Sequence, residues 1–280
     1  MTSAHLKTIN EDVLDGRLLY GDDFDVEEIQ RWYNDEERGF YDLATAHYGV
    51  TSEGGDYDYE YDALNRFHAF RYLSRFKFER CLAFGCARGD DVAPLAPVVD
   101  EFIGIEPVEE WWSDNIRGKP AHFMKPSVRG DIDLPSESVD LVTSLGVLHH
   151  IPNVTHVMAE LARLLRPGGY FVLREPISWM GDWRRARPGL TTNERGLPLT
   201  WIEQTTAKVG LHPVRLRLCQ FNALEIAFKR VGLHDLTRSM GFVRFDYCVS
   251  LAMSWNVRYR RESFFTKLAP SSVFGIFRRI

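Results

Sequence analysis

Three features of this sequence suit chemistry: a glycine-containing turn, an acidic residue after the next strand, and a pair of histidines. The turn reads Phe84-Gly85-Cys86-Ala87-Arg88-Gly89-Asp90-Asp91 and directly follows the buried-strand pattern at 80–84. Glycine lets a ligand approach the backbone closely, and the start of a following helix presents free N–H groups. We therefore interpret the turn as a cofactor-binding loop.

Two classes of cofactor use a loop of this kind. A dinucleotide site has glycines at its first, third and sixth positions, which here are positions 85, 87 and 90. Position 90 is an aspartate, and Asp91 follows it. Two carboxylates would repel a pyrophosphate, whereas S-adenosylmethionine carries no phosphate and has a sulfonium and an ammonium group. The loop therefore favours S-adenosylmethionine over a nicotinamide dinucleotide.

Glu106 is the expected partner of the cofactor ribose. It ends the predicted strand 101–106, twenty-one residues after Gly85. A carboxylate at this strand end is placed to accept hydrogen bonds from both ribose hydroxyls. The alternative is a solvated charge at a strand end.

His149, His150 and Glu175 are the candidate catalytic residues. The two histidines follow the predicted strand 139–145, and Glu175 ends the predicted strand 170–175. Ligands of open α/β sheets bind at this carboxyl edge. Methyl transfer to a hydroxyl benefits from a base near the reacting oxygen. The alternatives are that the histidines cap a turn before Pro152 and that Glu175 forms an ion pair.

The elements that must position these residues alternate along the chain. Strands are predicted at 80–84, 101–106, 122–128, 139–145, 170–175, 213–221 and 272–279, and helices at 90–99, 108–116, 154–165 and 199–210. Such alternation is typical of an α/β fold with a doubly wound, mostly parallel, seven-stranded sheet. We expect residues 1–78 to form an aromatic-rich helical cap, residues 79–280 the cofactor-binding domain, and 223–262 an insertion before the last strand that covers the acceptor.

Composition narrows the function further. The 280 residues are 45% hydrophobic and 26% charged with a net charge of −5, which disfavours a general nucleic-acid binder. Residues 1–60 hold 4 basic and 16 acidic side chains, whereas 177–280 hold 17 and 7. The basic C-terminal third suits an anionic acceptor. The four cysteines lack zinc-ligand spacing, so we expect no metal. Without a predicted signal or membrane-spanning segment, the expected location is the cytoplasm.

Four stretches resemble, in order, the motifs of class I S-adenosylmethionine-dependent methyltransferases, most closely those acting on small molecules. The stretches are CLAFGCARGDD, FIGIEP, GDIDLPSESVDLVTSLGVLHHIPN and LARLLRPGGYFVLREP. The resemblance covers 79–176, and the loop 174–198 is more weakly similar to methyltransferases of polysaccharide biosynthesis. It implies a Rossmann-like fold and S-adenosylmethionine as the cofactor.

The resemblance also implies roles for particular residues. Gly85, Cys86, Ala87 and Gly89 would surround the methionine part of the cofactor, and Glu106 would hold the ribose. Asp131 and Ile132 would flank the adenine, and Leu145 and Gly146 would lie beside the transferred methyl group. The chain departs from the family pattern at Ala83, where an acidic residue is common, and at Ala87, where the middle glycine is expected.

The sequence thus predicts transfer of a methyl group to a hydroxyl of a small polar metabolite, such as a sugar or glycan intermediate. Arg184, Arg185, Arg187 and Arg195 would hold an anionic group of the acceptor, or else be solvated, and Tyr57, Tyr59 and Tyr61 would cover it or pack on the sheet. The competing hypotheses are a catalytically inactive binding module, a lipid or quinone methyltransferase and, less favoured, a nucleic-acid methyltransferase. Nothing in the sequence indicates the oligomeric state.

Overall fold

The computed structural model describes most of the chain. The described residues are 10–48, 59–182, 185, 187, 189–234 and 236–280. Two residues predicted to contact the acceptor, Tyr57 and Arg184, lie outside them.

A single mixed sheet forms the centre of the molecule. Its strands in the described residues are β1 (Phe78–Phe84), β2 (Val99–Ile105), β3 (Asn115–Ile116), β4 (Lys119–Met124), β5 (Val139–Leu145), β6 (Leu165–Pro176), β7 (Leu211–Cys219) and β8 (Ser272–Arg279). The order across the sheet is β3-β4-β2-β1-β5-β6-β8-β7. The pairs among β4, β2, β1, β5 and β6 are parallel, and β3, β7 and β8 pair antiparallel. The sheet is therefore mostly parallel, as predicted, but has eight strands rather than seven.

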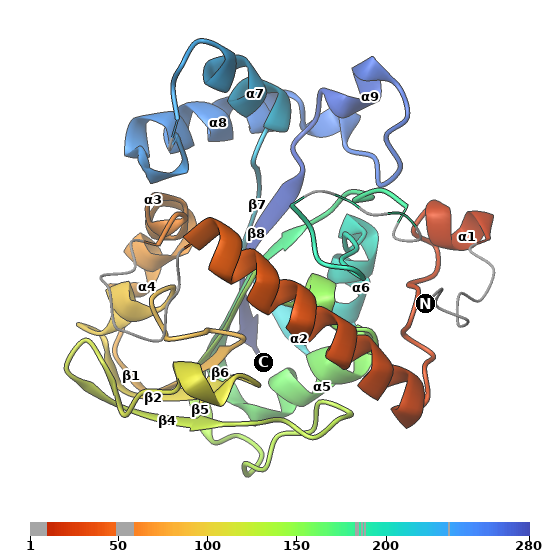
Figure 1. The fold of residues 1–280 in the computed structure, drawn as a ribbon. Coiled ribbons are helices and arrows are strands. Elements are labelled where there is room, and N and C mark those ends of the chain that lie inside the picture. The colour runs from red at the N-terminus through yellow and green to blue at the C-terminus, as the bar shows by residue number, and fades with distance from the viewer. Residues whose placement is uncertain (1–9, 49–58, 183–184, 186, 188, 235) are drawn as a thin grey trace.

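Helices cover both faces of this sheet. The α-helices of the described residues are α1 (Glu11–Leu14), α2 (Val26–Tyr48), α3 (Asp62–Asn65), α4 (Arg71–Leu73), α5 (Val154–Leu164), α6 (Leu199–Lys208), α7 (Asn222–Arg230), α8 (Met240–Ala252) and α9 (Phe264–Lys267). Figure 1 shows α2 crossing the molecule in front of the sheet, with α7, α8 and α9 gathered at one end.

Alternation along the strands divides the core between the two faces. Cys81 and Ala83 of β1 pack with α3 and α4, whereas Leu82 and Phe84 pack with α5 on the opposite face. Successive side chains of a strand point to opposite faces, and here both faces are apolar because both are covered. The two clusters hold the central strands, and therefore their carboxyl ends, in fixed positions.

Two predicted helices are wrong, and prolines and a tight turn explain why. In place of a helix over 90–99, the structure has only a 3₁₀ turn at Ala93–Leu95. Pro94 and Pro97 lack the backbone N–H groups that a helix over these residues would need as hydrogen-bond donors. In place of the helix over 108–116, a 3₁₀ turn is followed by β3. Arg117 and Gly118 both have positive φ angles, +48° and +81°, and make the two-residue connection of a β3–β4 hairpin.

None of the helices in the described parts of the chain combines the length and the apolar character that crossing a membrane requires.

Candidate active site

The ends of neighbouring parallel strands bring the predicted cofactor residues together. Phe84, the last residue of β1, lies beside Ile105 of β2 and Ser144 of β5. The residues that follow these strands, Gly85, Glu106 and Gly146, therefore leave the sheet at the same edge. Open parallel sheets bind their ligands at this carboxyl edge.

The turn after β1 depends on its two glycines. Gly85 and Gly89 have φ angles of +65° and +84°, a conformation that glycine adopts readily and other residues do not. A Cβ atom on Gly85 would lie 2.4 Å from Val147, and one on Gly89 would lie 2.4 Å from Ile116. Both glycines are therefore required by backbone conformation and by lack of space.

Ala87 occupies the middle position of this turn with a φ of +47°. A non-glycine residue in this left-handed region carries a strain of about 1–2 kcal/mol. Its methyl group packs with Val108 and Trp111, so the substitution for glycine is compensated by local contacts. The conformation expected of a glycine is thus kept although the residue is alanine.

Glu106 closes the turn from the neighbouring strand. One carboxylate oxygen accepts a hydrogen bond from the backbone N–H of Ala87 at 2.9 Å, and the other accepts one from Val108 N–H at 3.1 Å. The residue is only 4% exposed. The carboxylate therefore joins the turn after β1 to the turn after β2. Glu106 fixes the loop from its position at the carboxyl edge of the sheet.

Asp131 and Ile132 follow in a loop on the same side of the molecule as α5. The Asp131 carboxylate accepts a hydrogen bond from Ser127 Oγ at 2.9 Å and contacts His156 Nε2 at 2.8 Å. The Ser127 hydrogen bond, followed by that of His156, lowers the pKa of Asp131. Ile132 is buried, and its N–H donates to Glu160. Asp131 is therefore an exposed, ionised acceptor beside a buried apolar side chain.

A buried polar cluster around Asp91 adjoins this edge of the sheet. Asp91 is 7% exposed, and its Oδ1 atom has no hydrogen-bond partner among the described residues. Burial raises the pKa of Asp91 to about 7, although the charge of Arg174 opposes the rise. The Arg174 guanidinium donates to Asn65 Oδ1 (3.2 Å), Tyr59 Oη (3.1 Å) and Leu145 O (2.8 Å). The orphaned carboxylate oxygen therefore suits a cationic ligand.

Glu175 lies beneath the turn that follows β5. It is fully buried, and one of its oxygens accepts hydrogen bonds from Val147 N–H (2.9 Å) and Leu148 N–H (2.8 Å). The other oxygen accepts one from His149 N–H and contacts His149 Nδ1 at 2.7 Å. Because the amides make this carboxylate an acceptor, the Nδ1 atom carries the imidazole proton. Glu175 thereby fixes both the turn and the tautomer of His149.

His150 is held from the opposite side by α2. Its Nδ1 atom contacts Glu36 Oε2 at 2.7 Å, and Trp32 Nε1 donates to the His150 carbonyl at 2.6 Å. Burial lowers the pKa of His150, but the hydrogen bond and charge of Glu36 outweigh it, so the net shift is upward. For Glu36, burial is likewise outweighed by His150, and the net shift of its pKa is downward. Glu36 thus holds the His150 imidazole from its Nδ1 side.

The predicted arginine-rich loop contributes backbone support to this region. Arg195 is 1% exposed and donates to the carbonyls of His149 (3.4 Å) and Pro152 (2.8 Å). Arg187 donates to the carbonyls of Glu194 (2.6 Å) and Thr191 (3.0 Å). Arg185 is instead exposed and lies 3.9 Å from Asp182. Arg195 thus holds the loop against the histidine turn, and Arg187 connects parts of the loop to one another.

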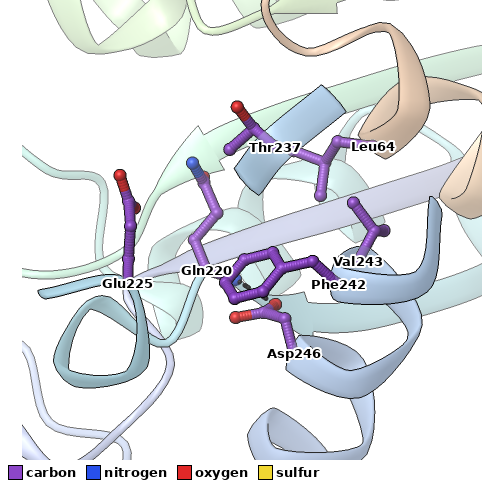
Figure 2. Close-up of a pocket in the computed structure, with 7 residues that line it drawn as sticks. All are labelled: Leu64, Gln220, Glu225, Thr237, Phe242, Val243 and Asp246. Atoms are coloured by element: carbon purple, nitrogen blue, oxygen red, sulfur yellow. Dashed lines mark hydrogen bonds between the residues drawn. The ribbon is translucent and has the colours of Figure 1, made fainter. Parts of the chain in front are cut away.

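A small pocket lies between the N-terminal helices and the segment predicted to cover the acceptor. Figure 2 shows it between α3 and α8, with side chains of both projecting toward it. Its lining residues are Leu64, Gln220, Glu225, Thr237, Phe242, Val243 and Asp246. Asp246 accepts hydrogen bonds from the backbone N–H groups of Gln220 and Phe221. Its carboxylate therefore joins α8 to the end of β7.

Several residues of the site were not predicted from the sequence. Glu36 and Asn65 belong to no local motif, Arg174 and Glu194 lie in stretches that resemble the family but received no role in the site, and Asp91 was considered only as a charge that would repel a pyrophosphate. The useful signal for Asp91 and Arg174 was their position, one in the glycine loop and the other next to Glu175 at a strand end. Glu36 and Glu194 gave no such signal.

Comparison with known proteins identifies the family. Residues 57–207 match the family model described as "Methyltransferase domain". A fatty-acid O-methyltransferase of Mycolicibacterium smegmatis is 26% identical over 205 residues, which cover 67% of this chain and 70% of that protein. A probable S-adenosylmethionine-dependent methyltransferase of the same organism is 29% identical over 96 residues, covering 34% of this chain and 37% of that protein. The chain spans about a third of the length of three curated relatives that it matches.

A solved structure shows the same fold. The 1,6-didemethyltoxoflavin-N1-methyltransferase of Burkholderia thailandensis, with S-adenosylhomocysteine bound, has 14% identity and a TM-score of 0.53, and the match covers 89% of each chain. The family match extends over more than half of the chain and includes the glycine loop, Glu106 and the histidine turn. The chain therefore belongs to the methyltransferase-domain family, whose members of this fold are class I methyltransferases that use S-adenosylmethionine.

Proposed function

We propose that the protein transfers a methyl group from S-adenosylmethionine to a hydroxyl oxygen of a small polar molecule, such as a sugar or glycan intermediate. The observation that carries this proposal is the His149–Glu175 pair, 2.7 Å apart and buried directly after the β5 edge. A histidine with its Nδ1–H held by a carboxylate presents its Nε2 lone pair as a base. A base is needed when the acceptor must lose a proton.

The residues around the glycine loop fit the cofactor. Gly85 and Gly89 supply close backbone approach, Glu106 supplies acceptors for the ribose hydroxyls, and Asp91 supplies an orphaned carboxylate oxygen for the ammonium group. S-adenosylmethionine, when bound, supplies the methyl group on its sulfonium. Cys86 lines the same loop as a buried, neutral thiol, since burial raises its pKa well above the ordinary value.

The adenine and methyl ends of the site are assigned to two further segments. Asp131 would accept a hydrogen bond from the adenine amino group, with Ile132 against the ring. Leu145 and Gly146 would lie beside the transferred methyl group; Gly146 has a φ of +82°, and a Cβ there would lie 3.1 Å from Arg174 Nη2. Backbone alone therefore occupies this point.

The two histidines have different proposed roles. We assign the base to His149, because its Nδ1 atom is held by Glu175 and the other ring nitrogen is left to face a substrate. Glu175 is a positioning residue, since its oxygens are occupied by amide and imidazole donors. His150 supports the pair from a ring-centre distance of 4.1 Å. Segment 223–262 would cover the acceptor; its helix α8 also encloses, together with α3, the pocket of Figure 2.

The relative that methylates fatty acids provides a second candidate acceptor class, a carboxylate. A carboxylate is already ionised at neutral pH, so it gains little from a base, whereas a hydroxyl gains about 10²–10⁴-fold in rate. Removal of His149 therefore distinguishes the two classes. The buried His149–Glu175 pair favours the hydroxyl.

The corresponding experiment measures transfer of radiolabelled methyl groups to a panel of sugars, phenols and fatty acids. For a hydroxyl acceptor we expect His149→Gln to lower kcat by about 10²–10⁴-fold, while the affinity for S-adenosylhomocysteine changes by less than about twofold. Equal activity of the variant and wild type on a hydroxyl acceptor would remove the base from the mechanism. Binding of the cofactor without transfer to any class of acceptor would favour the binding module.

Replacement of Ala87 by glycine should tighten cofactor binding with little effect on stability. Relief of the left-handed strain, about 1–2 kcal/mol, is offset by the flexibility of glycine, about 0.5–1 kcal/mol, and by one lost methyl contact, about 0.8 kcal/mol. The free energy of unfolding in urea should therefore change by less than about 1 kcal/mol. Calorimetric titration should show tighter S-adenosylhomocysteine binding, because a glycine lets the ligand approach the backbone more closely; weaker binding would contradict this interpretation.

A further inference from the structure

Three potential metal ligands meet at the turn after β5. His149, His150 and Glu194 each offer one ligand atom, and these atoms all lie within 4.8 Å of one another. His149 and Glu194 are buried and His150 is half-buried. The ligands come from two separate segments, so their meeting is a product of the fold rather than of a local sequence motif.

Each imidazole is oriented by a buried carboxylate on its Nδ1 side. Glu175 contacts His149 Nδ1 and Glu36 contacts His150 Nδ1, both at 2.7 Å. Metal-binding histidines almost always donate one ring N–H to a carboxylate or carbonyl, which fixes the tautomer and directs the other nitrogen to the ion. Both neighbouring histidines have this arrangement, which indicates a bound ion independently of the cluster itself.

The third ligand is held in place as well. One oxygen of Glu194 accepts hydrogen bonds from Thr191 N–H at 2.9 Å and from Thr191 Oγ1 at 3.0 Å. The same hydroxyl oxygen also lies 2.5 Å from Glu36 Oε2. The carboxylate that orients His150 and the carboxylate that completes the cluster are therefore connected through one threonine.

The charges around the cluster attract a cation. Glu175 and Glu36 each lie 2.7 Å from the Nδ1 atom of one imidazole, and Glu194 brings a third carboxylate to the same cluster. The nearby guanidinium groups of Arg187 and Arg195 donate to backbone carbonyls. Three carboxylates against two arginines leave the cluster with an excess of negative charge when both imidazoles are neutral.

We propose that His149, His150 and Glu194 bind one divalent transition-metal ion, with Zn²⁺ as the best match to two imidazoles and a carboxylate. Such a site leaves a coordination position for a further oxygen. The role of the ion rests on the proposed function: bound to His149, it would take over the part assigned to that imidazole as the base, contact the acceptor hydroxyl and lower the pKa of that hydroxyl. The hydroxyl proton would then leave to solvent, the new O–C bond would form and the S–C bond would break.

Binding of the ion is tested without any activity. Wild-type protein stripped with a chelator is titrated with Zn²⁺ by calorimetry, and with Co²⁺ by visible absorption, which reports coordination geometry. We expect one ion per chain, tetrahedral or five-coordinate Co²⁺ bands, and no competition from excess Mg²⁺, which prefers all-oxygen sites. Glu194→Gln keeps an acceptor for Thr191 and should weaken binding at least tenfold.

A matched control separates this site from ordinary surface histidines. His122 is exposed and lies 3.3 Å from Glu101, so His122→Gln should bind the ions as wild type does. His149→Gln/His150→Gln should lose the Co²⁺ bands while keeping the near-ultraviolet dichroism of the fold. Equal metal binding by wild type and this double variant would overturn the metal site. In that case methyl transfer by chelated enzyme should equal transfer by untreated enzyme. The proposed role of His149 as a base would then still stand.

Discussion

Replacing Glu106 by alanine is expected to weaken S-adenosylhomocysteine binding by about 10²–10⁴-fold. Glu106 anchors the N–H groups of Ala87 and Val108 and is assigned both ribose hydroxyls. Hydrogen bonds to a charged group contribute about 1.5–3 kcal/mol each, so two of them account for this loss. Calorimetric titration with S-adenosylmethionine and S-adenosylhomocysteine measures it directly.

The matched control for this variant is another glutamate of the same segment. Glu109 is exposed and pairs with Lys125 at 3.0 Å, so Glu109→Ala should bind the cofactor within about twofold of wild type. Glu106→Gln should be intermediate, because it keeps one acceptor oxygen. Undiminished binding by Glu106→Ala would mean that the carboxylate serves the loop alone and that the ribose lies elsewhere.

The fold was predictable where apolar patterns are long and uninterrupted. The predicted strands at 139–145 and 272–279 have the observed ends, and the predicted helix at 154–165 differs from α5 by one residue. In these segments burial on both faces, or on one helix face, determines the structure, and burial is visible in the sequence. The same signal located the strand ends and therefore the edge that holds the cofactor loop.

The rest depended on interactions that local patterns do not carry. The pairing of His150 with Glu36 joins residues 114 positions apart, and no periodicity reports such a contact. Likewise, the apolar residues around Trp111 suggested a helix, but the positive φ angles at Arg117 and Gly118 turn the chain into a hairpin. Sequence spacing therefore indicates the cofactor-binding residues more readily than the side chains that position the histidines.

Asp91 offers the second large effect, because it carries a buried carboxylate oxygen without a partner in the described chain. Asp91→Asn should weaken binding of S-adenosylmethionine and S-adenosylhomocysteine by a similar factor, about 10–100-fold at pH 8, if the carboxylate pairs with the ammonium group that both ligands share. Weakening of S-adenosylmethionine alone would assign Asp91 to the sulfonium instead. The exposed Asp100, 3.5 Å from Lys119, supplies the control Asp100→Asn.

The pH dependence follows from the raised pKa of Asp91, about 7 against an ordinary value of 3.8, which burial causes. The folded state holds this proton between those two values and the unfolded state does not, so its contribution to stability falls as pH rises from 4 to 7. Asp91→Asn removes that loss, and its midpoint of thermal unfolding at pH 8 should exceed that of wild type by several degrees.

Ligand affinity must show the opposite trend in the wild-type protein. A cationic ligand binds the ionised carboxylate, so affinity should decrease as pH falls below about 7, with a proton released on binding near that pH. The ratio of wild-type to Asp91→Asn affinity should then shrink between pH 8 and pH 5.5, because the protonated carboxyl resembles the amide. A ratio that stays constant over this range would mean that Asp91 acts through its shape rather than its charge. A shrinking ratio together with the gain in stability would show that the unpaired carboxylate destabilises the empty protein in order to bind a cation.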